Sequence, residues 1–111
     1  MRDCWMTRFL GESCATGVRV NDINVLRRRI DEINREIVGL LAKRMIVAGE
    51  IAEYKKRRGL PVHAPEREKA VIENVKRLAK ENGLDEKMAE DVFWKIIEHT
   101  RKSEEKQMGK Q

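Results

Sequence analysis

The sequence predicts an all-α fold: a three-helix chain with one very long N-terminal helix, intertwined with a second copy as a helical homodimer. Three observations predict it. Of the 111 residues, 41% are hydrophobic and 39% charged, whereas only 5% are aromatic and two are proline. Apolar residues between positions 26 and 54 recur in steps of four and three, the spacing of a helix that buries one stripe against other helices. Glycine and proline then divide the periodic part of the chain into three segments.

The first helix is predicted to begin after Asn21 or Asp22, either of which can cap it, and to run to about Arg58. Gly59 and Pro61 then end it. Its apolar stripe consists of Leu26, Ile30, Ile33, Ile37, Leu40, Val47, Ile51 and Tyr54.

The length of this helix is the argument for a dimer. About 35 helical residues extend roughly 50 Å, whereas a compact domain of about 90 residues is only about 30 Å across. Two shorter helices cannot cover such a stripe, and a single chain would expose it as an apolar patch. We therefore expect two copies to pair along it.

The second and third helices follow clear start and stop signals. Pro65 suits the first turn of the second helix, although Ala64 is a poor residue for the capping position before it. Asn82-Gly83 ends this helix, and Asp85 caps the third, which is expected to fray after about Gln107. The apolar stripes are Val71, Ile72, Val75, Leu78 and Ala79 in the second helix, and Ala89, Val92, Phe93, Ile96 and Ile97 in the third.

Residues 1–20 lack periodicity and are predicted to be a disordered or loosely packed tail, followed by one domain over residues 21–107 and a short tail over 108–111. Cys4 and Cys14 have neither the spacing nor the neighbours of a metal site or a disulfide framework. No segment approaches the roughly 20 apolar residues that span a bilayer, and the first 20 residues lack the apolar core of a signal peptide. We therefore expect a cytoplasmic protein that does not bind membranes.

In each predicted helix, polar residues occupy positions at which the apolar stripe would otherwise continue. Arg44 interrupts the first stripe, Glu68 extends the second, and Thr100 and Glu104 continue the third; Lys55 lies three turns after Arg44 on nearly the same face. These residues could be helix ends reaching water, or Arg44 could simply pair with Glu68 or Glu104. The alternative, which their convergence favours, is a cationic pocket inside the bundle that binds an anionic substrate.

The chemistry open to such a pocket is electrostatic. The sequence offers no nucleophile with a base partner, no metal-ligand spacing and no glycine-rich phosphate loop, and we expect His63 and His99 to be structural or solvated. What remains is to hold an anion, fix its conformation and stabilise charge that develops during a reaction.

The segments LRRRIDEINREIVGLLAKRMIVAGEIAEYK, GLPVHAPERE and IIEHTRKSEE resemble the monofunctional, all-helical class of chorismate mutase, and the resemblance covers residues 23 to about 107. The resemblance implies three-helix chains that form interlocked homodimers and rearrange chorismate to prephenate on the route to phenylalanine and tyrosine. It also implies that no cofactor or metal is needed.

The resemblance implies a role for each matching residue. Arg27 would reach a substrate carboxylate in the partner's site, whereas Arg44 would bind a carboxylate in its own chain. Lys55 would contact a carboxylate and the ether oxygen of the bond that breaks. Arg67 would add positive potential, and Glu68 would accept a hydrogen bond from the ring hydroxyl.

Three further positions complete the implied site. Thr100 matches a small hydroxyl residue that supports the ring carboxylate. Ala64 stands where many members have Asp, and it would contribute through its backbone N–H. Glu104 stands where several bacterial relatives have Gln, a donor to the ether oxygen. Because an ionised carboxylate cannot donate, we expect Glu104 to act in its protonated form.

Two other functions remain open from the sequence. An isochorismate pyruvate-lyase of the same fold would also bind a dicarboxylate between Arg and Lys side chains. A basic helical dimer that binds nucleic acid would use the net charge of +5 and the basic run over residues 55–58. Acidic residues interleaved with the basic ones argue against this second function.

Overall fold

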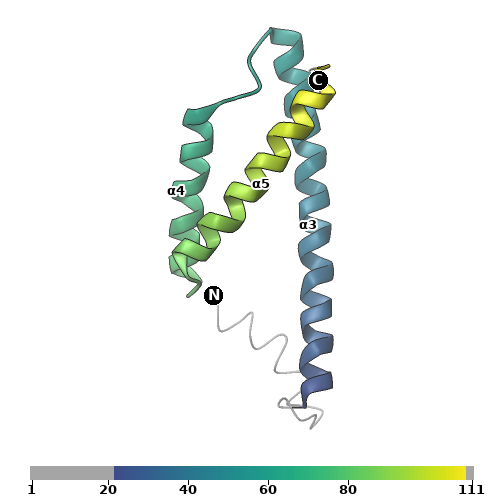
Figure 1. Ribbon diagram of the computed structural model, residues 1–111, viewed down its shortest axis with the longest axis vertical. Helices are drawn as coiled ribbons and strands as arrows, with labels where there is room; N and C mark the ends of the chain where they lie inside the picture. The colour runs from purple at the N-terminus through teal and green to yellow at the C-terminus, as the bar shows by residue number, and fades with distance from the viewer. Residues whose placement is uncertain (1–21, 110–111) are drawn as a thin grey trace. The chain divides into compact units, whose positions relative to one another are not determined.

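The computed structural model describes residues 22–109, which form three helices and contain no strand: α3 over Ile23–Arg58, α4 over Pro65–Glu81 and α5 over Glu86–Gln107 (Figure 1). The predicted all-α class and the bounds of the helices are confirmed. The chain divides into two compact units, Met1–Ala42 and Lys43–Gln111. The predictions for the 1–20 tail, for its two cysteines and for Asn21 as a cap lie outside the described residues.

Both ends of α3 follow from local sequence. At its start, the Asp22 side chain accepts a hydrogen bond from the Asn24 N–H at 2.9 Å. At its end, Gly59 adopts a positive φ of 67°, which glycine tolerates at no steric cost. The Leu60 N–H then reaches back to the Lys55 carbonyl at 2.8 Å, the bond that closes a Schellman motif. The backbone at Lys55 is thereby tied to the loop that follows.

In the first unit, the described residues belong to α3, and their apolar stripe is largely exposed in the single chain. Ile30, Ile37 and Leu40 are 55%, 48% and 63% exposed. A row of exposed apolar side chains of this kind is typical of an interaction surface.

In the second unit, α4 and α5 form an antiparallel hairpin (Figure 1). Gly83 has a φ of 71°, and the Leu84 N–H bonds to the Ala79 carbonyl at 2.8 Å, so α4 also ends in a Schellman motif. Asp85 caps α5 by accepting a bond from the Met88 N–H at 3.2 Å. Each of these turn residues was predicted from the sequence.

The core of the hairpin is small. Val75, Ala79 and Ala89 are buried, and Val71 and Phe93 pack against them. Two further residues of the predicted stripes, Leu78 at 43% and Val92 at 45%, are instead exposed in the single chain.

The part of α3 in the second unit buries a face next to the predicted stripe. Its buried residues are Ala48 and Ala52, whereas the stripe residues Val47, Ile51 and Tyr54 are about half exposed. A stripe defined by large apolar residues does not include the two alanines, because small side chains contribute little to the periodic pattern.

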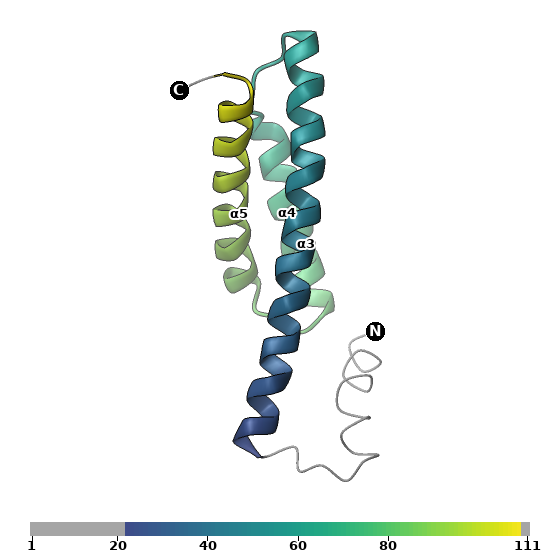
Figure 2. The ribbon, with the colours of Figure 1, turned by 90° about the vertical axis from the view of Figure 1, so that its right-hand side faces the viewer.

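A third small residue on α3, Gly49, makes contact with the end of α5. The Gln107 side-chain amide donates to the Gly49 carbonyl at 2.9 Å, and a Cβ at Gly49 would lie 3.3 Å from the Gln107 Oε1. The C-terminal end of α5 therefore lies beside the last turns of α3 (Figure 2). None of the described helices is long and apolar enough to cross a bilayer.

Candidate active site

Arg44 contacts a hydroxyl and an aromatic ring. Its guanidinium donates to Thr100 Oγ1 at 3.0 Å and lies 6.0 Å from the centre of the Phe93 ring, within the range of a cation–π contact. Within residues 22–109, no carboxylate pairs with it. The alternative in which Arg44 pairs with Glu68 or Glu104 is therefore wrong.

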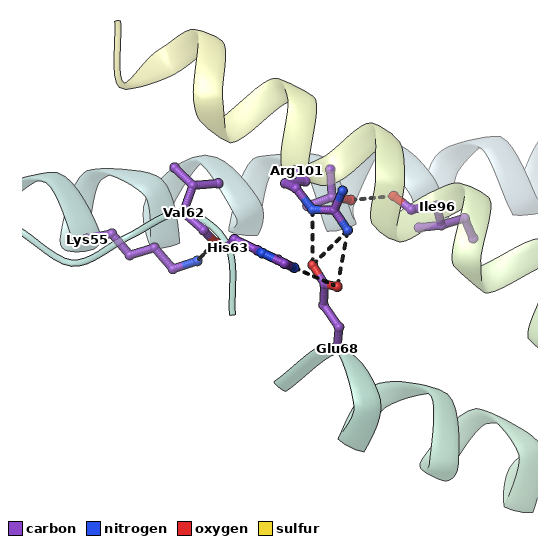
Figure 3. Close-up of polar contacts among 7 residues, drawn as sticks. Lys55, Val62, His63, Glu68, Ile96 and Arg101 are labelled. Carbon is purple, nitrogen blue, oxygen red and sulfur yellow. Dashed lines mark hydrogen bonds and ion pairs between the residues drawn. The ribbon is translucent and has the colours of Figure 1, made fainter. Parts of the chain in front are cut away.

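Lys55 and Glu104 pair with each other instead. The Lys55 ammonium lies 3.2 Å from Glu104 Oε1. It also donates to the Val62 carbonyl at 2.8 Å (Figure 3). Both side chains are well covered, with exposed fractions of 16% and 9%. An ammonium has three N–H donors, and within residues 22–109 the third is given to no residue.

Glu68, at the start of α4, pairs with Arg101 on α5. Arg101 Nε lies 3.2 Å from Glu68 Oε2, and one terminal guanidinium nitrogen lies 3.1 Å from each carboxylate oxygen (Figure 3). His63 approaches the same carboxylate, with Nε2 3.7 Å from Oε1, from an exposed position in the loop. A two-pronged pair of this kind fixes the orientation of the carboxylate.

Thr100 has both of its hydrogen-bonding functions engaged. Its hydroxyl accepts from Arg44 and can donate to the Ile96 carbonyl at 2.8 Å, one turn earlier in α5. Thr100 therefore orients the Arg44 guanidinium.

The balance of charge decides what this cluster can bind. It contains three cations, Arg44, Lys55 and Arg101, and two carboxylates, Glu68 and Glu104. Each carboxylate has its own partner, so the charge of the half-buried Arg44 is left without a counter-ion among the described residues. Covering a guanidinium without an anion is costly, so the arrangement favours an anionic ligand beside Arg44.

The remaining predicted residues lie apart from this network. Ala64 is the N-cap of α4 and makes no side-chain cap, as expected for alanine. Arg67 is exposed, and within residues 22–109 no hydrogen bond or ion pair joins it to the cluster. Arg27 is exposed on the part of α3 that belongs to the first unit.

Arg101 was missed by the sequence reasoning. A signal for it exists, because Phe93, Ile97 and Arg101 follow one another at intervals of four residues along α5. The steps from Ile97 to Thr100 and Glu104, which continue the third apolar stripe, do not include it. Glu104 is buried, with 7% exposed, whereas its neighbour Glu105 is half-buried.

One residue of the basic run at the end of α3 is withdrawn from the surface. Lys55 is directed to Glu104 and Val62, whereas Lys56, Arg57 and Arg58 are exposed, with Arg58 over the Tyr54 ring at 4.7 Å from its centre. The run therefore offers three exposed cations, not four, to a surface that tracks phosphates.

Comparison with known families identifies the chain. The model of the family described as chorismate mutase type II matches residues 26–105, most of the chain. The chain belongs to the chorismate mutase type II family. The resemblance noted in the sequence is thus confirmed, and with it the activity class: an enzyme that isomerises chorismate.

Several curated relatives support this family. The chorismate mutase of Methanocaldococcus jannaschii is 38% identical over 76 residues, which are 68% of this chain and 77% of that protein. The 4-amino-4-deoxychorismate mutase of Streptomyces venezuelae is 30% identical over 77 residues, 69% of this chain and 75% of that protein. The T-protein of Enterobacter agglomerans is 33% identical over 85 residues, but these cover only 23% of its length. No solved structure matches the chain.

Proposed function

We propose that the chain rearranges chorismate to prephenate in one pericyclic step, by electrostatic stabilisation and restriction of the substrate's conformation, in phenylalanine and tyrosine biosynthesis. The observation that carries this proposal is that Arg44 has no carboxylate partner among residues 22–109, next to two carboxylates that are each paired. A dicarboxylate substrate supplies the missing negative charge. The reaction needs no nucleophile, general base, metal or cofactor.

Arg44 and Lys55 carry the main roles in this proposal. Arg44, held by Thr100, binds one substrate carboxylate. Lys55 directs its third N–H to the substrate, where it contacts a carboxylate and the ether oxygen on which negative charge grows as the C–O bond breaks. Glu104 lies beside Lys55 and donates to the same oxygen in its protonated form.

The other assigned residues bind or orient the substrate. Glu68 accepts from the ring hydroxyl, and Arg67 adds positive potential at the start of α4. Ala64 contributes its backbone N–H, and Thr100 supports the ring carboxylate through Arg44. Three of these residues lie at the N-terminus of α4: Ala64 is the N-cap, and Arg67 and Glu68 are in the first turn. The unpaired N–H groups there favour anions, which supports these three assignments.

We further propose that two chains form a homodimer in which Arg27 reaches the site of the partner. The exposed apolar side chains of α3 support it, because a surface of this kind in a single chain is unfavourable in water. They are Ile23, Ile30, Ile37, Val38, Leu40, Ile46, Val47, Ile51 and Tyr54. A functional domain over residues 21–107 and a cytoplasmic location belong to the same proposal.

The test is to follow the loss of chorismate absorbance with purified protein and to compare wild type with Arg44→Ala. Removing one preorganised cation from the reacting centre should lower kcat/KM by about 100-fold or more. Arg57→Ala, which removes an exposed arginine from the same helix, is the matched control and should stay close to wild type. Thermal unfolding of both variants checks that the fold is kept.

Product identification separates the proposal from its nearest rival. Prephenate is the expected product, whereas a pyruvate-lyase acting on isochorismate would release salicylate and pyruvate. If wild type leaves chorismate unchanged, or if Arg44→Ala is as active as Arg57→Ala, the proposed function is wrong.

A further inference from the structure

The pair formed by Arg101 and Glu68 has a consequence for which substrate the site accepts, provided that the proposed function holds. The three contacts between them measure 3.1–3.2 Å, and Glu68 is only 15% exposed. Arg101 comes from α5 and Glu68 from α4, so the pair joins the two arms of the hairpin (Figure 3).

Counting acceptor positions shows what Glu68 can still do. A carboxylate offers about four, and Arg101 takes about two of them, because its Nε–H and one terminal N–H, shared between the two oxygens, make the three contacts. His63, at 3.7 Å, is beyond hydrogen-bond range. Glu68 can therefore still accept a hydrogen bond from a substrate, from a direction that Arg101 determines by fixing the carboxylate plane.

The charge of the pair is equally constrained. A guanidinium does not lose its proton in a protein, so Arg101 always offsets the negative charge of Glu68. A neutral hydroxyl donor at this point gains a hydrogen bond and meets no net charge. An ammonium donor gains the same bond but lies close to the fixed positive charge of Arg101, which disfavours it.

We propose that Arg101 is a positioning and specificity-determining residue, which orients and neutralises Glu68 so that the site selects a substrate with a ring hydroxyl over one with a ring amine. Arg101 acts through Glu68 and does not need to touch the substrate itself.

The competing explanation is that Arg101 only stabilises the hairpin. The hairpin already has a packed core of Val75, Ala79 and Ala89 and a closed turn at its far end. A purely structural contact would change the affinity for both kinds of substrate by the same factor. A role in specificity changes their ratio.

The experiment measures two constants in wild type and in Arg101→Gln. These are kcat/KM for chorismate and the inhibition constant of 4-amino-4-deoxychorismate, in which an amine replaces the ring hydroxyl. Since a hydrogen bond to a charged group is involved, kcat/KM should fall about tenfold, while the amine should bind about tenfold more tightly.

Lys102→Gln is the matched control, because Lys102 is the next residue, carries the same charge and pairs with Glu98 at 3.3 Å. Its two constants should remain within about twofold of wild type.

A second variant covers the case in which Arg101→Gln does not fold. Arg101→Lys keeps the charge but loses the two-pronged geometry, so it should lower kcat/KM and retain most of the preference against the amine. If folded Arg101→Gln weakens the use of chorismate and the binding of the amine by the same factor, or if Arg101→Lys loses the preference against the amine altogether, the inference is wrong. Turnover of chorismate by wild type reports on the proposed function separately.

Discussion

Arg44 and Lys55 lie eleven residues apart on the same face of α3, yet their surroundings differ. Lys55 has a carboxylate partner and a carbonyl, whereas Arg44 has a hydroxyl and the face of an aromatic ring. Lys55 is therefore held in place before any substrate arrives, and Arg44 retains most of its attraction for an anion. Lys55 is thus positioned in advance for the reaction, whereas Arg44 supplies binding energy for the anionic substrate.

Glu104 is the residue at which one substitution separates two roles. Glu104→Gln replaces the carboxyl group by an amide, which donates without needing a bound proton. If the carboxyl group donates to the ether oxygen, the variant should be at least as active as wild type, whereas a residue needed for its negative charge beside Lys55 should lose activity on this change. The charged group within bonding distance of Glu104 is Lys55, which the substitution leaves in place.

The measurement is kcat/KM for chorismate for both proteins at the same pH. Glu105→Gln, on the neighbouring half-buried residue, is the control and should stay close to wild type. An inactive Glu104→Gln would contradict the role assigned to Glu104.

At the level of elements, the two halves of α5 have different roles, one in the apolar core and one in polar contacts. Its first half contributes Ala89 and Phe93 to the hairpin core. Its second half carries the polar residues that meet α3 and α4, from Thr100 to Gln107. The geometry of the site therefore depends on how firmly the first half anchors the helix.

The cap at Asp85 should contribute measurably to that anchoring. Asp85→Ala removes the acceptor for the Met88 N–H and should lower stability by about 1 kcal/mol, which is about 4–8 °C in Tm for a domain of this size. Asp85→Asn keeps a side-chain oxygen and should stay close to wild type. The measurement is thermal unfolding at equal protein concentrations, and equal losses in the two variants would show that the cap is unimportant.

The start and end of each helix could be predicted because the signals are local. Each signal acts within one turn of its own position. As expected, Gly59 and Gly83 end helices, and Pro65 and Asp85 mark where helices begin. The polar interruptions at Arg44 and Glu104 were visible for the same reason, since they break a regular pattern.

What could not be predicted depends on contacts between helices. The sequence does not say that Glu68 pairs with Arg101, because that pairing requires the packing of α5 against α4. It also does not say that Ala48 and Ala52 are the buried residues of α3, since small side chains carry little periodic signal although they allow close approach. A stripe of large apolar residues predicts a buried face but not the partner that covers it.

For the whole molecule, the exposed stripe of α3 and the position of Arg27 lead to a test by mixing. In a two-fold symmetric dimer with Arg27 acting across the interface, a mixed pair of Arg27→Ala and Arg44→Ala chains contains one site with both arginines intact. Random pairing then restores about a quarter of wild-type activity.

The experiment co-expresses the two variants and compares the mixture with each variant alone, both of which should be nearly inactive. Sedimentation measures the oligomeric state in the same samples. If Arg27 served the site of its own chain, every site in the mixture would lack one arginine and no activity would return. A monomeric protein would exclude the arrangement altogether.

The glycine at position 59 has a further consequence. Its φ of 67° lets the chain turn so that Leu60 and Val62 bond to the backbone and the side chain of Lys55, respectively. Nothing lies within 4 Å of a Cβ at this position, so a substitution is opposed by the positive φ and not by crowding. If the turn moves to relieve that strain, the Lys55 ammonium is misdirected although no reacting atom is touched. A random-mutagenesis screen for lost growth without phenylalanine and tyrosine should therefore recover lesions at Gly59, and a survey that considered only residues near the substrate would overlook them.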